Sequence, residues 1–447
     1  MKPMARFLTL PFTFVAALSL GCDTQQPSGL RSALALDKTA TAGNRGCPDG
    51  KPGEREARRV NTPIGLACVV TVPDNPITSS DIGWVDPGTE RYYIADRSNF
   101  GVDIVDAENV VYVGRVSGMA GPLTSGGGTA TTNGPGPNGV LVTPNRHLWA
   151  GDGNSTARVA DVDPGSPNYL SIIGSTSTAI AACDNATAHY CGRADELGYD
   201  PEDDVILVAN NAPLSVAAGH APVAPYATFI SAAPPYAVLG HVAFAGAGGL
   251  EQPLWDPAIH RFFLTVPGKT GVTPASVAVI NPTSRMVEAT YTFDCLARTG
   301  AAGVGTTGEA LGDFQHLLVS ACGKPIILNA LTGDVINVIM QVGGGDEVWY
   351  NPGDRRFYVT GVDSAATPPV QSLGVIDAQT TMWLQNVADV RGKNPAASAE
   401  NNRILTVVQI TAAIAAAPAT DNSVCTLFGV RGRGCIAVFT HAGGPDN

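Results

Sequence analysis

Apolar and polar residues recur along the chain in a repeated unit that predicts pairs of short β-strands. Each unit opens with an acidic or amide residue, passes through an apolar stretch and a tight turn that often contains Asp-Pro or Asn-Pro, and ends in an apolar run. Pro and Gly at such intervals punctuate many short strands better than a few long helices. Six copies start at Asp81, Asn138, Asp195, Glu251, Glu309 and Asp346, and a weaker seventh lies near Ala396.

A second motif, two apolar runs around a short turn, follows the first one. Examples begin at Val102, Ala275, Pro325 and Ser372. The two motifs together give four antiparallel strands per repeat, which is the composition of a propeller blade. The sequence therefore predicts an all-β fold, a single seven-bladed β-propeller over residues 61–441.

The two ends of the repeat region complement each other. A strand that begins at Cys435 has no partner strand after it, and a strand that begins at Ile64 has no blade before it. We expect the N-terminal strand to complete the last blade, which would close the ring and remove exposed sheet edges.

One stretch resembles a known repeat. Tyr93–Ala107, with the sequence YIADRSNFGVDIVDA, is similar to the junction between the second and third strands of an NHL repeat. The region from about Ile64 to Phe439 resembles the YVTN and NHL families of bacterial β-propellers at the level of the repeat. The resemblance implies the fold and says little about activity, because propellers host unrelated functions.

The first 22 residues read as a secretory signal. Positive charges precede the apolar run Phe7–Leu20, which is too short to span a membrane comfortably. The run ends in Leu-Ser-Leu-Gly-Cys22, which resembles a bacterial lipobox and implies lipidation of Cys22. Ser19 departs from the lipobox pattern, and the alternative is a soluble secreted form.

The signal sets the expected domain order and location. Residues 1–22 form the lipoprotein-type signal peptide, residues 23–60 a polar tether, and residues 442–447 a short tail. The protein is expected in the bacterial cell envelope, periplasmic or at the surface, with membrane contact only through the N-terminal lipid.

Cysteine usage agrees with export. The chain has nine cysteines, and removing Cys22 leaves eight, an even number that suits an oxidising compartment. No C-x-x-C motif is present, which argues against zinc ribbons and thioredoxin chemistry. Proximity in the predicted topology suggests the pairs Cys183–Cys191, Cys295–Cys322, Cys425–Cys435 and Cys47–Cys68, with Cys68–Cys435 as an alternative that would lock the ring.

Charge narrows the range of partners. The formal net charge is −12, from 27 basic and 39 acidic residues. Nucleic acid is excluded as a partner, because phosphate binding needs basic surface. A protein or a small molecule remains as the expected partner.

Long insertions fall at one end of the predicted blades. The turns within each motif are tight, and they define the bottom of the propeller; the connections between motifs define the top. Elaboration on one side suggests a binding face, because function concentrates on loops held by a rigid scaffold. The long segments, all in top connections, are Ser117–Pro137, Gly174–Ala194, Asn211–Tyr226, Leu296–Gly308, Val362–Gln371 and Thr411–Arg433.

The residues that open the repeats are expected to face the top of the central channel. Five carboxylates and one amide at one narrow opening would repel one another or hold a cation. Hard oxygen ligands suit Ca²⁺ or Mg²⁺. The alternative is a water-filled acidic funnel, or carboxylates that cap backbone N–H groups. The candidate ligands are Asp81, Asn138, Asp195, Glu251, Glu309 and Asp346.

This ring resembles that of the gluconolactonase-like propellers, which hold a divalent cation in the channel with Glu, Asn and Asp. The resemblance implies that Asn138, together with Glu251, Glu309 or an aspartate, serves as a ligand.

Two functions remain open, and the sequence does not decide whether the protein is an enzyme. The first is a non-enzymatic propeller that binds a protein or small ligand on its top face. The second is a divalent-metal-dependent hydrolase of a lactone or ester, in which the cation polarises a carbonyl or activates water. Glu251, Glu309 or Asp195 would then act as base or ligand.

Overall fold

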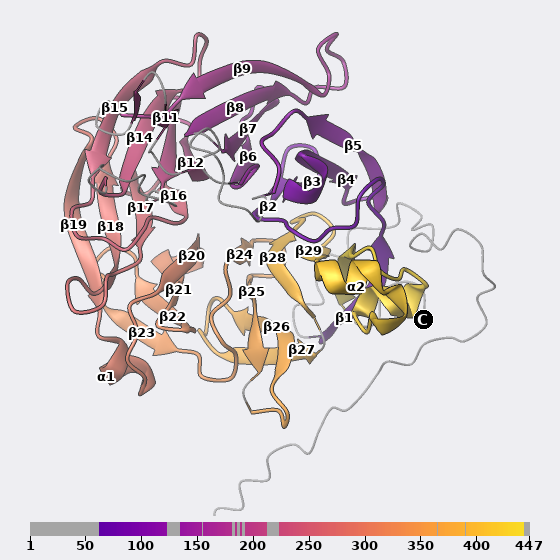
Figure 1. Ribbon diagram of the computed structural model, residues 1–447. Coiled ribbons are helices and arrows are strands. Elements are labelled where there is room, and N and C mark those ends of the chain that lie inside the picture. The colour runs from indigo at the N-terminus through magenta and orange to yellow at the C-terminus, as the bar shows by residue number, and fades with distance from the viewer. Residues whose placement is uncertain are drawn as a thin grey trace, which may run out of the picture. The chain divides into compact units, whose positions relative to one another are not determined.

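The computed structural model describes residues 62–441 apart from 123–134, 154, 181–183, 186–187, 190–192, 212–222, 364 and 389. In this part of the chain, seven antiparallel sheets of four strands each stand around a central axis (Figure 1). The prediction of an all-β, seven-bladed propeller is confirmed. The predicted signal peptide, tether, tail and lipidated Cys22 lie outside the described residues.

The strands of the first six blades follow one another in chain order. The first blade contains β2 (Gly83–Asp86), β3 (Arg91–Asp96), β4 (Gly101–Asp106) and β5 (Val111–Ser117). The second contains β6 (Val140–Val142), β7 (His147–Asp152), β8 (Thr156–Asp161) and β9 (Ser171–Ser177). The third contains β12 (Ala194–Asp200), β13 (Val205–Asn210), β14 (Tyr226–Ser231) and β15 (Val238–Ala243).

The remaining blades repeat this arrangement. The fourth contains β16 (Pro253–Asp256), β17 (Arg261–Val266), β18 (Ala275–Asn281) and β19 (Met286–Phe293), and the fifth β20 (Thr306–Leu311), β21 (His316–Ala321), β22 (Lys324–Asn329) and β23 (Val335–Val338). The sixth contains β24 (Val348–Asn351), β25 (Arg356–Asp363), β26 (Val370–Asp377) and β27 (Trp383–Ala388). The seventh contains β28 (Gly392–Ala397), β29 (Ile404–Val408), β30 (Cys435–His441) and β1 (Ile64–Val70).

Sequence patterns explain the position of each strand within a blade. Middle strands lie between two neighbouring sheets, so both of their faces are covered and their sequences are nearly continuous apolar runs. All six residues of β13, VILVAN, are buried. Outer strands cover one face only, and β9, SIIGSTS, accordingly alternates between exposed and less exposed positions.

The N-terminal strand closes the ring as predicted. β1 pairs antiparallel with β30, and the register places Ile64 opposite His441 and Cys68 opposite Val438. Blade 7 therefore combines strands from both ends of the described region in one sheet. No outer edge of β30 is left unpaired.

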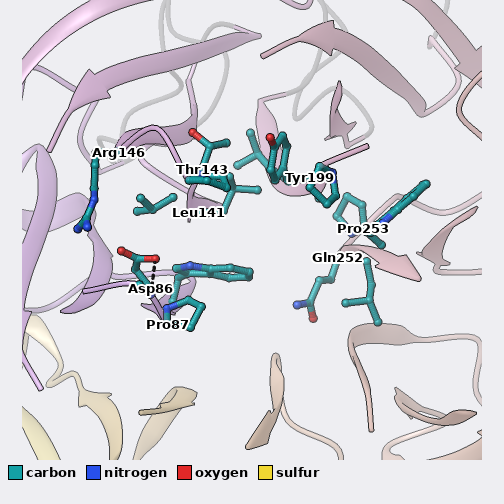
Figure 2. A pocket seen from close by; sticks show the side chains of 17 residues that line it. Asp86, Pro87, Leu141, Thr143, Arg146, Tyr199, Gln252 and Pro253 are labelled. Atoms are coloured by element: carbon teal, nitrogen blue, oxygen red, sulfur yellow. Dashed lines mark hydrogen bonds between the residues drawn. The ribbon is translucent and has the colours of Figure 1, made fainter. Parts of the chain in front are cut away.

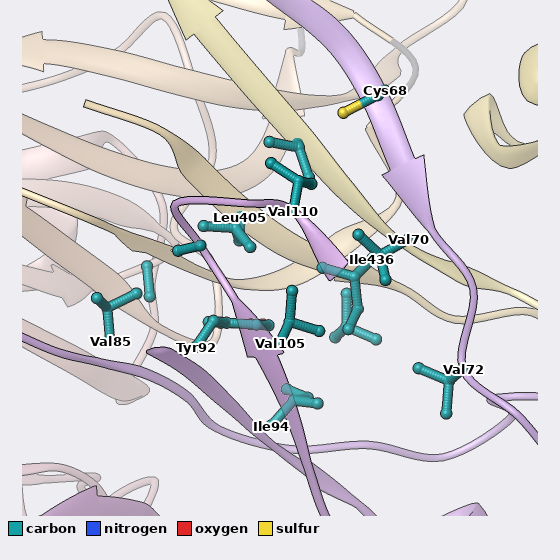
Figure 3. Close-up of a cluster of buried hydrophobic side chains, with 14 of the residues drawn as sticks. Cys68, Val70, Val72, Val85, Tyr92, Ile94, Val105, Val110, Leu405 and Ile436 are labelled. Carbon is teal, nitrogen blue, oxygen red and sulfur yellow. The ribbon is translucent and has the colours of Figure 1, made fainter. Parts of the chain in front are cut away.

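Apolar side chains fill the space between adjacent sheets. Figure 3 shows one such cluster, in which Val85, Tyr92 and Val105 of blade 1 meet Leu405 and Ile436 of blade 7. All five are at most 2% exposed. Close packing of this kind makes each blade depend on its neighbours, because truncating one buried side chain typically costs about 2–5 kcal/mol.

Two of the predicted disulfides are confirmed, Cys295–Cys322 and Cys425–Cys435. The alternative pairing Cys68–Cys435 is wrong, because Cys435 is bonded to Cys425. Cys68 is itself disulfide-bonded, and its predicted partner Cys47 lies outside the described residues, as do Cys183 and Cys191. Disulfides indicate that the chain folds in an oxidising compartment.

Short helices and a small hairpin occupy the connections. They are η1 (Arg97–Asn99), β10 (Asp184–Asn185), β11 (Ala188–His189), α1 (Cys295–Thr299), η2 (Asp313–Gln315), α2 (Ala412–Ala416), η3 (Pro418–Thr420) and η4 (Val424–Phe428). All except η2 lie in top connections. Within the described ranges, no helix has the length and apolar character needed to cross a membrane.

Candidate functional site

The first strand of each blade lines the central channel. Each of these strands contacts the first strand of both neighbouring blades, so that they form an unbroken inner ring. The strands are β2, β6, β12, β16, β20, β24 and β28.

One position at the top end of these strands, or one or two residues before them, is called the ring position below. It lies five residues before the residue that opens the bottom turn, for example Asp81 before Asp86, which pairs with Arg91. The residues at the ring position, in chain order, are Asp81, Asn138, Asp195, Glu251, Thr307, Asp346 and Lys393.

Five of the six predicted residues occupy the ring position, and Glu309 does not. In blade 5 the ring position belongs to Thr307, and Glu309 lies two residues further along the strand. The same inter-blade bond supports this register in two places: Gly139 N–H donates to Asp195 O at 3.1 Å, and Gly308 N–H donates to Asp346 O at 2.7 Å.

The seventh ring position also differs from expectation. The sequence repeat placed it near Ala396 with no acidic residue, and the structure places Lys393 there. Lys393 Nζ lies 2.6 Å from Asp81 Oδ1 and also forms an ion pair with Asp346. A lysine thus stands between the two aspartates that flank it in the ring.

A second cation comes from a top connection. Arg97 begins the short helix η1, which Asp96 caps by accepting the N–H of Asn99. The Arg97 guanidinium forms an ion pair with Asp81. It also donates two hydrogen bonds to Asn138 Oδ1, from Nε at 3.1 Å and from Nη2 at 2.6 Å.

A third cation stands beside the third blade. Arg193 Nη2 lies 2.8 Å from Asp195 Oδ2, and Asn211 Nδ2 donates to the same oxygen at 3.3 Å. Asn138 Nδ2 donates to Ala194 O at 2.7 Å, so both ends of this amide are engaged. Sequence reasoning missed all three cations. Arg97 and Arg193 come from top connections outside the repeated motif, and the weak seventh repeat was placed near Ala396 and not at Lys393.

These ion pairs change the acidity of the ring. Burial opposes ionisation of Asp81, but Lys393 and Arg97 outweigh it and lower the pKa of this carboxyl to about 2. Burial also disfavours the charged form of Lys393, yet Asp81 and Asp346 raise the pKa of the ammonium group above its usual value. Asp81 and Lys393 therefore both favour their charged forms at neutral pH.

Four glutamates behave in the opposite way; Glu196, Glu309 and Glu347 are buried, and Glu251 is partly buried. Burial, reinforced by neighbouring carboxylates, raises the pKa of Glu196, Glu251 and Glu347 well above the usual range. For Glu309 burial alone raises the pKa, and neither carboxyl oxygen has a hydrogen-bond partner among the described residues. These shifts favour protonated, neutral glutamates.

Charge in the channel is therefore balanced by the protein itself. The ring aspartates have their own fixed counter-ions, and the neutral glutamates add no net charge. A divalent cation would have to displace these ion pairs, so the ring does not fit Ca²⁺ or Mg²⁺ well. Within the described ranges, no group of three or more His, Cys, Asp or Glu side chains is arranged to hold a metal ion. The balanced pairs are Asp81, Asp195 and Asp346 with Arg97, Arg193 and Lys393.

The opposite end of the channel contains a cavity of about 550 Å³, called the bottom pocket below. Inner strands and bottom turns of blades 1–4 form its walls, and Figure 2 shows their side chains around the open space. Aromatic and aliphatic groups dominate. Residues that define the pocket include Trp84, Leu141, Arg146, Tyr199, Gln252 and Trp255.

Comparison with known proteins supports the fold and goes no further. No protein-family model matches the chain, and no curated protein matches it significantly. Among solved structures 1271 chains match, including one from the crystal structure of the mitotic checkpoint complex. That chain is 12% identical, with a TM-score of 0.50, over 83% of this chain and 96% of the other. The propeller implied by the YVTN and NHL resemblance is thus shown, and membership of those families stays a prediction.

Proposed function

We propose that the protein is an exported, lipid-anchored propeller that binds a protein partner on its top face and has no catalytic role. The observation that carries this proposal is the one-sided elaboration of the blades. In blade 7, the top connection between β29 and β30 contains three short helices, α2, η3 and η4. The bottom turn between β28 and β29 is tight.

Disulfides hold the elaborated connections in place. Cys295 at the start of α1 is bonded to Cys322, which follows β21, so that the connection from blade 4 to blade 5 is joined to a top connection within blade 5. Cys425 in η4 is bonded to Cys435 at the start of β30. A loop ordered before binding loses less entropy on binding, which favours a recognition surface.

Exposed apolar side chains stand on these same connections. Leu296 in α1 is 63% exposed and Leu427 in η4 is 37% exposed, each close in sequence to a bonded cysteine. Phe100 and Val272 are exposed in two other top connections. Large apolar groups on loops held in place are typical of protein interfaces.

The state of the channel favours binding over hydrolysis. The groups that a metal-dependent hydrolase would use as ligands are bonded to Arg97, Arg193 and Lys393.

A photo-crosslinking amino acid at position 296 or 427, in the native envelope, tests the top face. We expect a specific protein adduct from both positions. Met286 in blade 4 is the matched control, because it is also 63% exposed but lies at a bottom turn. Equal adducts from all three positions, or none from 296 and 427, would refute the proposal. The anchor is tested separately, by loss of detergent-phase partitioning in Cys22→Ser.

A further inference from the structure

We propose that the bottom pocket is a second binding site, for a small aromatic molecule that carries an anionic hydrogen-bond acceptor such as a carboxylate or sulfonate. This site lies at the opposite end of the propeller from the top face, and it does not depend on the function proposed above.

Size and wall chemistry set the body of the ligand. A cavity of about 550 Å³ falls within the range of small-molecule sites, roughly 300–1,000 Å³. Trp84, Tyr199 and Trp255 come from three different blades and line it together with Leu141 and Leu254. Aromatic faces offer a large contact area to a flat ring, which favours an aromatic ligand.

Most polar groups in the wall are already engaged within their own turns. The carboxylate of Asp86 accepts the N–H of Gly88 at 3.1 Å and the hydroxyl of Thr89 at 2.5 Å. The Tyr199 hydroxyl donates to Asp204 Oδ1 at 3.0 Å. These groups fix the shape of the pocket and leave little capacity for a ligand.

Two side chains, Gln252 and Arg146, offer unengaged donors to the pocket. The indole N–H groups of Trp84 and Trp255 also lack a partner among the described residues, but they are buried in the wall. Gln252 Oε1 accepts the N–H of Glu309 at 2.8 Å, which leaves its amide nitrogen without a partner among the described residues. The Arg146 guanidinium, which also lines the pocket, makes no hydrogen bond or ion pair with the described part of the chain. Figure 2 shows these two side chains on opposite sides of the pocket.

The donors decide the polarity of the ligand. A guanidinium stays protonated in proteins and offers only donors, as does the free Gln252 nitrogen. A ligand that satisfies them has to bring acceptors, and an anion beside Arg146 makes a charge-assisted bond. The chain has a net charge of −12, which repels an anion at long range. Binding of an anionic ligand should therefore depend strongly on Arg146.

Two dyes test the proposal. The first, 8-anilinonaphthalene-1-sulfonate, has an aromatic body and an anionic acceptor; the second, N-phenyl-1-naphthylamine, has a similar body without charge. Fluorescence titration of the full-length protein should show one saturable site for the anionic dye, with energy transfer from tryptophan. In Arg146→Gln we expect its affinity to fall by roughly 10-fold or more, while the neutral dye binds as before.

Arg285→Gln is the matched control. Arg146 and Arg285 both lie at bottom turns with positive φ, 65° and 58°, so the two substitutions meet similar backbone demands. Leu254→Trp should fill the pocket and weaken both dyes, and circular dichroism checks that it still folds.

Each contrary result bears on the proposal. Equal affinity of the anionic dye in wild type and Arg146→Gln would overturn the ligand class. Undiminished binding in Leu254→Trp would place the dyes elsewhere and overturn the site, as would the absence of any saturable binding. None of these outcomes would alter crosslinking from positions 296 and 427, so the two proposals fail separately.

Discussion

Lys393 and Asp81 form an ion pair across the point where the ring closes, although 312 positions separate them in the chain. Lys393 belongs to the inner strand of the last blade, and Asp81 precedes that of the first. The pair therefore joins the two blades at the channel, in addition to the strand pairing between β1 and β30.

The first prediction concerns this pair. Lys393→Met removes a counter-ion from Asp81 and Asp346 while keeping most of the apolar stem. Because the lysine side chain is 29% exposed, we expect a moderate loss of about 1–3 kcal/mol in the free energy of unfolding. Urea denaturation measures it. Lys269→Met, in an exposed loop, is the control, and an equal effect of both substitutions would contradict the structural role of the pair.

The second prediction concerns divalent cations. Since the ring has its own counter-ions, millimolar Ca²⁺ or EDTA should leave the melting temperature of the wild type nearly unchanged. In Lys393→Met, Asp81 and Asp346 lose the lysine that neutralises them. Added Ca²⁺ can then bind these carboxylates and should raise the melting temperature of the variant. Differential scanning calorimetry measures both. A clear calcium-dependent rise in the wild type would restore the metal-site hypothesis.

The third prediction concerns pH. Burial raises the pKa of Glu309 above its usual 4.5, so at higher pH the folded chain keeps a proton that the unfolded chain releases. Stability therefore falls as pH rises above about 4.5, by up to about 1.4 kcal/mol per pH unit for this group. Glu309→Gln removes this pH-dependent contribution. The free energy of unfolding of the variant, relative to that of the wild type, should therefore rise between pH 5 and pH 8.

Unfolding free energies at several pH values test this expectation. Glu288→Gln is the control, because Glu288 is exposed and Arg261 lowers the pKa of its carboxyl, so it is ionised in both states over this range. Parallel pH profiles for wild type and Glu309→Gln would show that the buried carboxyl does not retain its proton.

The fourth prediction concerns the disulfides. They close loops of different length, with sequence separations of 27 for Cys295–Cys322 and 10 for Cys425–Cys435. In the chain-entropy model, removing the first pair costs about 3.5 kcal/mol and the second about 2.7 kcal/mol. Double serine variants, compared by denaturant unfolding, should show this order. The reverse order would mean that native contacts, and not loop length, determine the cost.

Local signals made most of the fold predictable. Turn residues such as Asp86-Pro87 mark the strands of each blade, and an unpaired strand at each end of the repeat region indicates closure. The register of blade 5 was not predictable, because its bottom turn contains no proline and uses Phe314 and Gln315 in the left-handed conformation. The sequence pattern consequently predicts Glu309 as the ring residue in place of Thr307.

The chemistry of the channel was less predictable than its geometry. The repeat identified the acidic side chains but not the cations, because Arg97 and Arg193 come from connections that differ between blades. The repeat pattern does not indicate the bottom pocket either, for a similar reason. Its walls combine single residues such as Trp84, Tyr199 and Trp255 from separate repeats, and only the closed ring brings them together.

The pairing of β1 with β30 has a consequence for biosynthesis. The ribosome makes β1 before any other described strand and β30 after all the others, so the seventh sheet stays one strand short until β30 has been made. Chains that terminate early cannot close the circle, and their open blades offer unpaired backbone to proteases. Synthesis through β30 is thus a condition for proteolytic resistance, and the fold itself separates closed molecules from shorter fragments.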